Sequence, residues 1–255
     1  MNIKSLRTEF DRDGFVIVRQ LLNAGEFAEL NWQLERYIRE VVPTLDDSHA
    51  FYEDKRRPET LKQMQHMNGD TYFREYGNHP AWMALAEGLV GESVKPMEPE
   101  WFNKPPGTNH VTPPHQDNYY FCLEPPNVVT IWMALDVVDD DNGCLRYVAG
   151  SHRKGVREHG RSQVLGFSQG ILDYGARDHE REVPIHLQPG DVVVHHGNTI
   201  HRAEANRSPT RNRRAFAIVY RGASCQRDES AFARYQSAVK QQHQQLGLKT
   251  EKTTN

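Results

Sequence analysis

The chain has 255 residues, 37% hydrophobic and 25% charged, which is enough for one core with helical decoration or for two small domains. Its formal net charge of −3 gives no reason to expect nucleic acid or an anionic membrane as a partner. The three cysteines have no paired spacing, and no apolar run approaches membrane-spanning length. We therefore expect a soluble cytoplasmic protein without a disulfide framework.

The first hundred residues are predicted to be mostly helical. A short apolar run over 14–22 predicts a buried strand, and it precedes a helix over 25–43, where apolar side chains recur at helical spacing. The stretch 59–67 is a candidate helix inside a polar segment. A further helix is predicted over 80–90, because a proline stands at its start and a glycine follows its end.

From about Lys95 the pattern changes to short apolar runs separated by Pro, Gly and Asn. The runs predicted to be strands are 128–138, 144–150, 182–187, 192–196, 199–205 and 213–222. Only DDDNG (139–143) separates the first two runs, so we expect them to pair as a hairpin. Many short strands between turns favour an antiparallel sandwich or jelly roll over a parallel sheet. The polar segment 151–181 is predicted to be an insertion over one mouth of that sandwich.

No repeat or linker divides the chain, so we expect residues 1–255 to form one domain. Its parts would be a helical N-terminal region to about residue 94, a jelly-roll core over about 95–225, and a C-terminal helix and tail over 226–255.

His115 and Asp117 form the only His-x-Asp pattern in the chain. In an extended segment, side chains two residues apart project from the same face. An imidazole and a carboxylate placed in this way supply two-thirds of a 2-His-1-carboxylate facial triad, which leaves three positions of an octahedral iron(II) open. With 13 histidines, about one such pattern is expected by chance, so the alternative is a loop histidine beside a turn-forming aspartate. Two prolines before His115 favour an extended segment.

The third ligand should come from a distant strand, and the candidates are His195, His196 and His201. In a strand over 199–205, the face that carries His201 otherwise carries only small residues, as a metal pocket requires. We therefore favour His201, and either neighbour at 195 or 196 could orient the ligands or the cosubstrate.

Arginine is the best partner for a ligand carboxylate, because its planar fork binds two oxygens. Arg213 and Arg214 both precede the last apolar run. By strand parity Arg213 shares a face with alanines, whereas Arg214 shares one with bulkier core residues. Arg213 is therefore the predicted ligand-binding arginine, and the alternative for the wider arginine group is a solvated basic loop.

Three runs of sequence are together similar to one enzyme family. They are FNKPPGTNHVTPPHQDNYYF, VVTIWMALDVVDDDNGCLRYVAGSHRKG and QPGDVVVHHGNTIHRAEANRSPTRNRRAFAIVYRG. Their combination resembles the phytanoyl-CoA dioxygenase family, and the segments EFDRDGFVIVRQLL and PAWMALAEGLVG fit its usual order.

The resemblance implies that His115, Asp117 and His201 bind iron(II), with 2-oxoglutarate as cosubstrate and O₂ as oxidant. Arg213, the first arginine of Arg-Arg-Ala, matches the residue that pairs with the C5 carboxylate of 2-oxoglutarate. The implied fold is mainly β: a double-stranded β-helix (jelly roll, cupin-like) with N-terminal helices packed on one sheet.

Three further cosubstrate contacts follow from the same resemblance. Trp132 matches a tryptophan that lines the cosubstrate pocket, and Lys62 falls where family members place a lysine near 2-oxoglutarate. Gln116, between two of the ligands, is the third candidate. The alternatives are a core tryptophan, a solvated lysine and an outward-facing glutamine.

The sequence departs from the family pattern after the distal histidine. Many members carry Gly-Ser there, and the serine can contact the cosubstrate, whereas this chain has Arg202 and Ala203. Related halogenases replace the aspartate ligand by a small residue. Because Asp117 is retained, the expected reaction is hydroxylation of a small molecule at an unactivated C–H, with release of succinate and CO₂.

Two rival functions are also compatible with these residues. One is a metal-dependent cupin-like isomerase or hydrolase that holds zinc through His195, His196 and His201. The other is a non-catalytic jelly-roll ligand-binding protein. The motifs encode neither the oligomeric state nor the substrate, for which an acyl-CoA and a natural-product or amino-acid derivative are the candidate classes.

Overall fold

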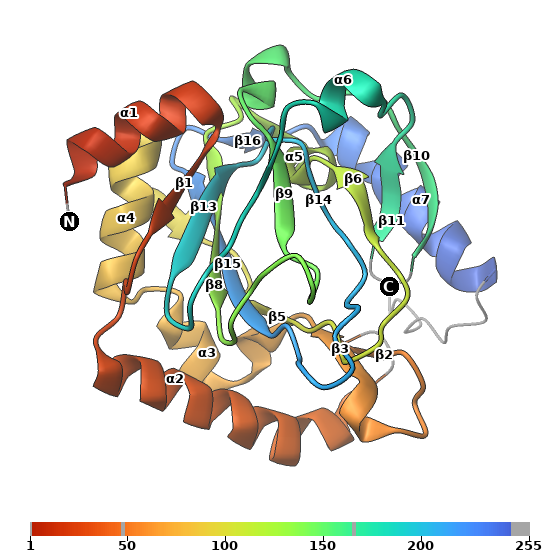
Figure 1. Ribbon diagram of the computed structural model, residues 1–255. Coiled ribbons are helices and arrows are strands. Elements are labelled where there is room, and N and C mark those ends of the chain that lie inside the picture. The colour runs from red at the N-terminus through yellow and green to blue at the C-terminus, as the bar shows by residue number, and fades with distance from the viewer. Residues whose placement is uncertain (1, 47–48, 165–166, 246–255) are drawn as a thin grey trace.

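The computed structural model describes residues 2–46, 49–164 and 167–245. Two antiparallel sheets face each other in its centre (Figure 1). The larger sheet has the strand order β2-β3-β5-β15-β8-β13-β1, with β4 paired to β15, and the smaller has the order β12-β9-β14-β6. This confirms the expected jelly-roll core.

The strands of the larger sheet come from both halves of the chain. They are β1 (Phe15–Val18), β2 (Ala50–Tyr52), β3 (Leu61–Met64), β4 (Val94–Pro96), β5 (Glu100–Phe102), β8 (Val128–Ala134), β13 (Val192–His196) and β15 (Ala215–Gly222). The smaller sheet contains β6 (Thr112–His115), β9 (Leu145–Val148), β12 (Glu182–Pro184) and β14 (His201–Ala203).

Helices from the N-terminal part cover the outer face of the larger sheet (Figure 1). They are α1 (Ile3–Asp13), α2 (Ala24–Arg36), α3 (Thr71–Tyr76) and α4 (Pro80–Val90). Asn23 begins α2 through a capping box with Glu26, which satisfies backbone N–H groups that the first turn leaves free. After α2 the chain continues as a π turn (Tyr37–Val41) and a 3₁₀ turn (Val42–Thr44).

Apolar side chains fill two layers, one on each side of the larger sheet. The outer layer lies between that sheet and the helices, and Trp82, Phe73 and Phe216 are fully buried there. The inner layer lies between the two sheets and contains smaller residues such as Ala215 and Ala217 beside Trp132. The small side chains leave space between the sheets, and the functional site lies in that space.

The insertion and the C-terminal segment surround the smaller sheet. The insertion contains a 3₁₀ turn (Ser151–Lys154), the hairpin β10 (His159–Val164) and β11 (Phe167–Ile171), and α6 (Ala176–His179). The C-terminal segment contains β16 (Gln226–Arg227) and α7 (Glu229–Gln245). Between β6 and β8 the chain forms α5 (Asp117–Phe121) and β7 (Leu123–Glu124), and β7 pairs with β16. Two 3₁₀ turns, Pro58–Thr60 and Met67–Gly69, flank β3. Within the described residues, no helix combines the length and apolar character needed to cross a membrane.

Two local predictions were wrong. The candidate helix at 59–67 is a short 3₁₀ turn followed by β3, because β3 finds hydrogen-bonding partners in both β2 and β5. The runs at 128–138 and 144–150 do not form a hairpin. The turn between them carries the chain from one sheet to the other, and the side chain of Asn142 stabilises it by accepting from the backbone N–H of Asp139 and donating to the carbonyl of Val137.

Candidate active site

Two side chains from one short segment and a third from a distant strand converge between the sheets. His115 ends β6, His201 begins β14, and these residues lie directly opposite each other in the strand pair. Asp117 is the first residue of α5. Its Oδ1 lies 3.6 Å from Nε2 of His115 and 3.5 Å from Nε2 of His201, and the three potential ligand atoms lie within 4.8 Å of one another.

Backbone carbonyls determine which ring nitrogen of each histidine faces this point. Nδ1 of His115 lies 2.7 Å from the carbonyl of Pro113, and Nδ1 of His201 lies 3.0 Å from the carbonyl of Thr199. A carbonyl only accepts hydrogen bonds, so Nδ1 carries the proton in both rings. The lone pair of Nε2 is therefore available to a metal, as the carbonyl partners of metal-binding histidines usually ensure.

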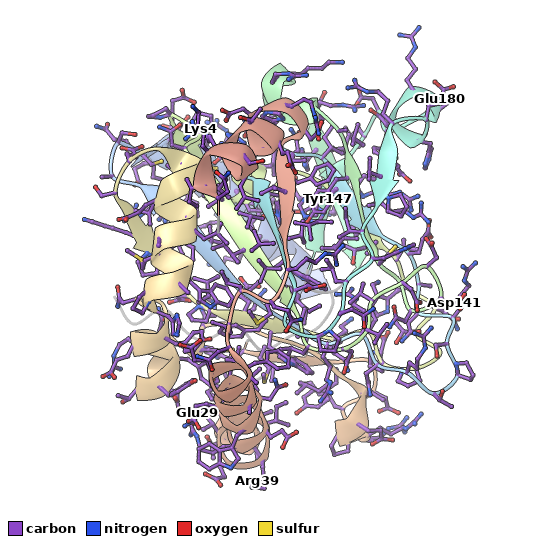
Figure 2. All side chains as sticks on the ribbon, turned by 60° about the vertical axis from the view of Figure 1, so that its left-hand side comes forward. Lys4, Glu29, Arg39, Asp141, Tyr147 and Glu180 are labelled. Carbon is purple, nitrogen blue, oxygen red and sulfur yellow. The ribbon has the colours of Figure 1, made fainter. Side chains whose placement is uncertain are left out.

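Asp117 is held on its other oxygen. Thr130 donates to Oδ2 at 2.6 Å, and Nε2 of His195 donates to it at 2.9 Å. The hydroxyl of Tyr147 lies 2.9 Å from Nδ1 of His195, where it donates to the lone pair. Tyr147 lies between the sheets, whereas labelled charged residues such as Lys4 lie at the periphery (Figure 2). These contacts leave Oδ1 of Asp117 facing the two imidazoles.

The charge states suit a divalent cation. Burial lowers the pKa of both His115 and His201, so these imidazoles are neutral. Burial raises the pKa of Asp117, but the neighbouring histidines lower it by more, so the carboxylate stays ionised. Two neutral nitrogens and one carboxylate oxygen, all buried and within 4.8 Å of one another, match the donor set of a facial-triad iron(II) site.

The three-histidine site of the rival zinc enzyme is not formed. His195 and His196 are consecutive strand residues and point to opposite faces of the sheet. The ring of His196 packs near Phe10 and His152, outside the space between the sheets. His195 instead orients Asp117, one of the two roles that the sequence left open for it.

A cavity of about 110 Å³ adjoins the convergent side chains. Its lining has one carboxylate, Asp117, but three basic side chains: Lys62, Lys104 and Arg213. We refer to these three as the cavity cations. All three are buried, with 9%, 2% and 4% of their surface exposed, respectively. The cavity therefore suits a ligand that brings negative charge.

Arg213 faces this cavity, and no carboxylate of the described residues forms an ion pair with it. Its Nε has no hydrogen-bond partner among the described residues, and its guanidinium carbon lies 5.3 Å from the centre of the Trp132 ring. Burial lowers its pKa to about 10, so it remains charged at neutral pH. Arg214 points elsewhere and makes a bidentate pair with Asp136. The two arginines thus occupy opposite faces, in the arrangement that strand parity predicts.

The other predicted contacts differ in position. Trp132 and Lys62 line the cavity, and Nζ of Lys62 lies 4.0 Å from the carboxylate of Glu53. The structure does not bring Gln116 into the cavity. Its amide donates to the carbonyls of Gly155 and Asn198 at 2.8 and 2.7 Å and accepts from the N–H of residue 157 at 2.7 Å. That side chain anchors the insertion to the site.

Sequence reasoning missed Lys104. It lies in an irregular stretch without a motif of known chemistry, and its burial depends on a pairing with a segment more than a hundred residues away. Two features of the sequence point to an extended segment here: an apolar side chain precedes the Asn-Lys pair, and two prolines follow it.

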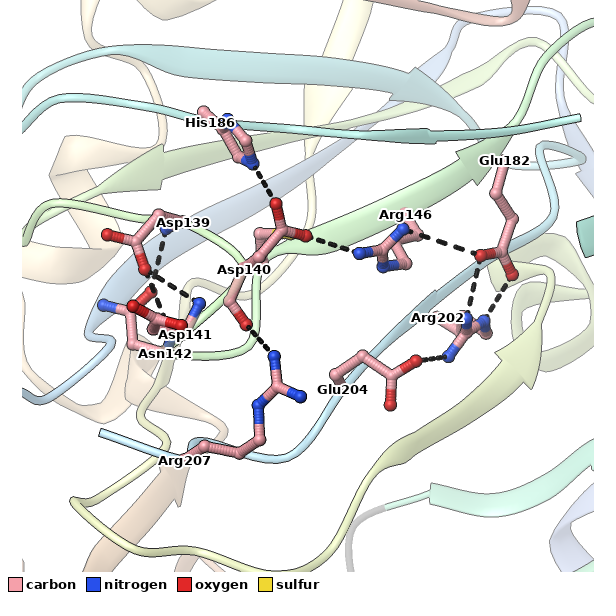
Figure 3. Close-up of polar contacts among 11 residues, drawn as sticks. Asp139, Asp140, Asp141, Asn142, Arg146, Glu182, His186, Arg202, Glu204 and Arg207 are labelled. Atoms are coloured by element: carbon pink, nitrogen blue, oxygen red, sulfur yellow. Dashed lines mark hydrogen bonds and ion pairs between the residues drawn. The ribbon is translucent and has the colours of Figure 1, made fainter. Parts of the chain in front are cut away.

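A second group of charged side chains lies on the outer face of the smaller sheet (Figure 3). We call it the outer-face network, and its members are Asp140, Arg146, Glu182, His186, Arg202 and Glu204. Asp140, Cys144 and His186 lie close enough to hold a metal. However, Arg146 contacts the same carboxylate of Asp140, and that guanidinium would oppose a cation.

Comparison with known proteins agrees with this geometry. The family model described as phytanoyl-CoA dioxygenase matches residues 10–215. Peroxisomal phytanoyl-CoA dioxygenase from Bos taurus is 26% identical over 239 residues, which cover 88% of this chain and 70% of that protein.

Two solved structures are also similar. EvdO2 from Micromonospora carbonacea var. aurantiaca, complexed with 2-oxoglutarate, has 26% identity and a TM-score of 0.68, covering 86% of this chain and 90% of that chain. The epimerase SnoN, in complex with Fe3+, alpha ketoglutarate and nogalamycin RO, has 24% identity and a TM-score of 0.73, covering 91% and 88%. The second likeness concerns the fold alone.

Proposed function

Because the chain belongs to the phytanoyl-CoA dioxygenase family, we propose that it hydroxylates a small-molecule substrate at an unactivated C–H and releases succinate and CO₂. Iron(II), 2-oxoglutarate and O₂ are the cofactors of this family. One observation carries the proposal: His115, Asp117 and His201 converge beside Arg213, a buried cation that has no carboxylate partner in the described structure.

In this proposal the chain holds the metal and the diacid in fixed positions. Nε2 of His115, Nε2 of His201 and Oδ1 of Asp117 would hold iron(II). Bound iron(II) and 2-oxoglutarate together supply the O₂ activation that breaks a substrate C–H bond. Arg213 neutralises the far carboxylate of the diacid, and the Trp132 ring forms one wall of its pocket. Thr130 and His195 hold Oδ2 of Asp117, so Oδ1 is the oxygen that would be available to iron(II).

The substrate would reach this point beside an aromatic group near the insertion. The ring of Tyr120 lies 5.7 Å from that of His115, and Tyr119 stacks on His159 at 4.1 Å. The hydroxyl of Tyr120 donates to the carbonyl of Gln169 in β11, which fixes the ring. An acyl-CoA and a natural-product or amino-acid derivative remain the candidate classes. The cytoplasmic location expected from the sequence belongs to this proposal, and three unpaired cysteines are compatible with it.

The test begins with binding and then measures turnover. Anaerobic protein should bind one equivalent of iron(II) and then 2-oxoglutarate, and a library of small molecules should contain some that stimulate succinate formation and O₂ uptake. Incorporation of ¹⁸O from O₂ into the product would support hydroxylation, whereas succinate formation with an epimerised product and no added oxygen would replace it by epimerisation. Protein that binds iron(II) but never binds 2-oxoglutarate would overturn the proposal.

A further inference from the structure

Lys104 and Arg213 are direct neighbours across a short antiparallel bridge. The N–H of each residue donates to the carbonyl of the other at 3.2 Å. In such a pair the two side chains project from the same face of the backbone. Both side chains line the cavity. The fold thus places two buried basic groups side by side at one end of the ligand space.

The described structure gives this pair no anion at ion-pair distance. Nζ of Lys104 donates to the carbonyl of His110 at 3.1 Å, and Nε of Arg213 has no partner. Burial lowers the pKa of Lys104, the charges of Arg213 and Lys62 lower it further, and the more distant carboxylates of Glu53 and Glu204 raise it by less. Like charges directly opposite each other destabilise a strand pair, and burial increases that cost. A ligand carboxylate at this pair would favour the charged form of Lys104 and offset the repulsion between the two side chains.

A turn at Gly143 leaves room for the side chain of Lys104. Gly143 has a φ of +81°, and a Cβ atom there would lie 3.0 Å from Cδ of Lys104 and 2.5 Å from the carbonyl of Glu204. The lysine stem therefore lies against Gly143, close to the segment that follows Ala203. That is the part of the chain in which this sequence lacks the serine hydroxyl found in many relatives.

We propose that Lys104 holds the far carboxylate of 2-oxoglutarate together with Arg213 and supplies the contact that Ala203 lacks. This inference rests on the proposed function. An ammonium has three N–H donors, and the carbonyl of His110 takes one, so two remain for the carboxylate. Lys62 differs from Lys104 in its charge partner, because the carboxylate of Glu53 lies near Lys62 and balances its charge.

The test compares two ligands that differ in one group. 2-Oxovalerate has the keto acid and carbon chain of 2-oxoglutarate but ends in a methyl group instead of the far carboxylate. Anaerobic calorimetry on iron(II)-loaded Lys104→Met should show 2-oxoglutarate bound about 10- to 100-fold more weakly, because a charged hydrogen bond is lost. The affinity for 2-oxovalerate should stay within about twofold of the parent value.

Two controls make the result specific. Lys95→Met removes an exposed lysine from β4 and should change neither affinity. Lys104→Arg keeps a cation and should recover part of the 2-oxoglutarate affinity. If Lys104→Met weakens both ligands equally, or weakens neither, Lys104 does not hold the far carboxylate. That result is distinct from failure of the proposed function, in which the parent protein itself would not bind 2-oxoglutarate.

Discussion

The cavity cations and the outer-face network lie on opposite sides of the smaller sheet. The charges of the outer-face network are paired within the protein, whereas those of the cavity cations are largely unpaired. In the outer-face network Glu182 accepts from Arg202 through both oxygens and lies 4.0 Å from Arg146, while Arg202 also contacts Glu204 (Figure 3). Among the described residues, Lys62 is the one cavity cation with a carboxylate at ion-pair distance, and Nε of Arg213 has no hydrogen-bond partner.

The difference shows how the pairing of charges can distinguish a ligand site from a structural network. Paired charges at a partly exposed sheet surface are ordinary structural features, and each side chain there supplies its neighbour's counter-ion. Buried cations left without a partner cost folding free energy, so a fold retains them where a ligand completes them. Substitutions in the two groups should therefore have opposite effects on stability and on ligand binding.

The largest effect is expected at Asp117, the only carboxylate of the cavity lining. Asp117→Ala removes one of three metal ligands and should weaken iron(II) binding by at least about 100-fold and abolish turnover. Metal content after dialysis and anaerobic titration would measure this. Asp140→Ala, in the outer-face network, is the matched control and should leave the iron stoichiometry at one. Loss of the single iron in that control would mean that the metal binds at Asp140 instead.

Arg213→Met should separate ligand binding from stability. We expect 2-oxoglutarate affinity to fall about 100-fold, because a fully buried charge-assisted pair is lost. The melting temperature without ligand should stay the same or rise, because the variant no longer buries an unpaired charge. Arg214→Met is the neighbouring control and should lose the Asp136 pair, with a small drop in melting temperature and unchanged affinity. The reverse pattern for the two arginines would refute the assignment.

Glu182→Gln should give the opposite result in the outer-face network. Only 5% of this side chain is exposed, and its removal leaves Arg202 and Arg146 with fewer partners. The free energy of unfolding should fall by about 2–4 kcal/mol, with 2-oxoglutarate affinity unchanged. Denaturant unfolding and calorimetry on the same preparation would measure both quantities. A stable variant with weakened cosubstrate binding would remove the distinction between the two groups.

The smallest effect concerns pH. Burial raises the pKa of Glu182, but its hydrogen bonds with Arg202 and Tyr174 lower it by more, so the folded-state pKa lies below the ordinary 4.5. A lowered carboxyl pKa contributes stability that is present above about pH 4.5 and is lost as pH falls through the folded value. Between pH 6 and 3 the parent should therefore lose more stability than Glu182→Gln. Parallel acid profiles for the two proteins would contradict this.

Local patterns in the sequence were sufficient for the parts of the site that depend on strand parity. His115 and Asp117 project to the same point, and Arg213 and Arg214 project to opposite faces, because side chains alternate along an extended chain. The architecture followed from many short strands between turns. These features need no knowledge of which strands are neighbours.

The parts that sequence reasoning missed depend on strand pairing. The expected hairpin failed because β8 and β9 find partners in different sheets, a choice made by packing rather than by the turn between them. Lys104 was missed for the same reason, because only its pairing with Arg213 brings it into the cavity. Gln116 lies next to two ligands in sequence, yet its side chain binds backbone groups of the insertion.

The opposed positions of His115 and His201 also have a consequence for how fast the protein is degraded in the cell. β6 is an edge strand of the smaller sheet, and its pairing with β14 is irregular, so few backbone hydrogen bonds hold it to that sheet. An ion held by both strands and by the start of α5 would link these three elements and stabilise the edge of the sheet. Protein made during iron scarcity would then open more often at this edge and be degraded faster by proteases, so the supply of metal would also set the abundance of the protein.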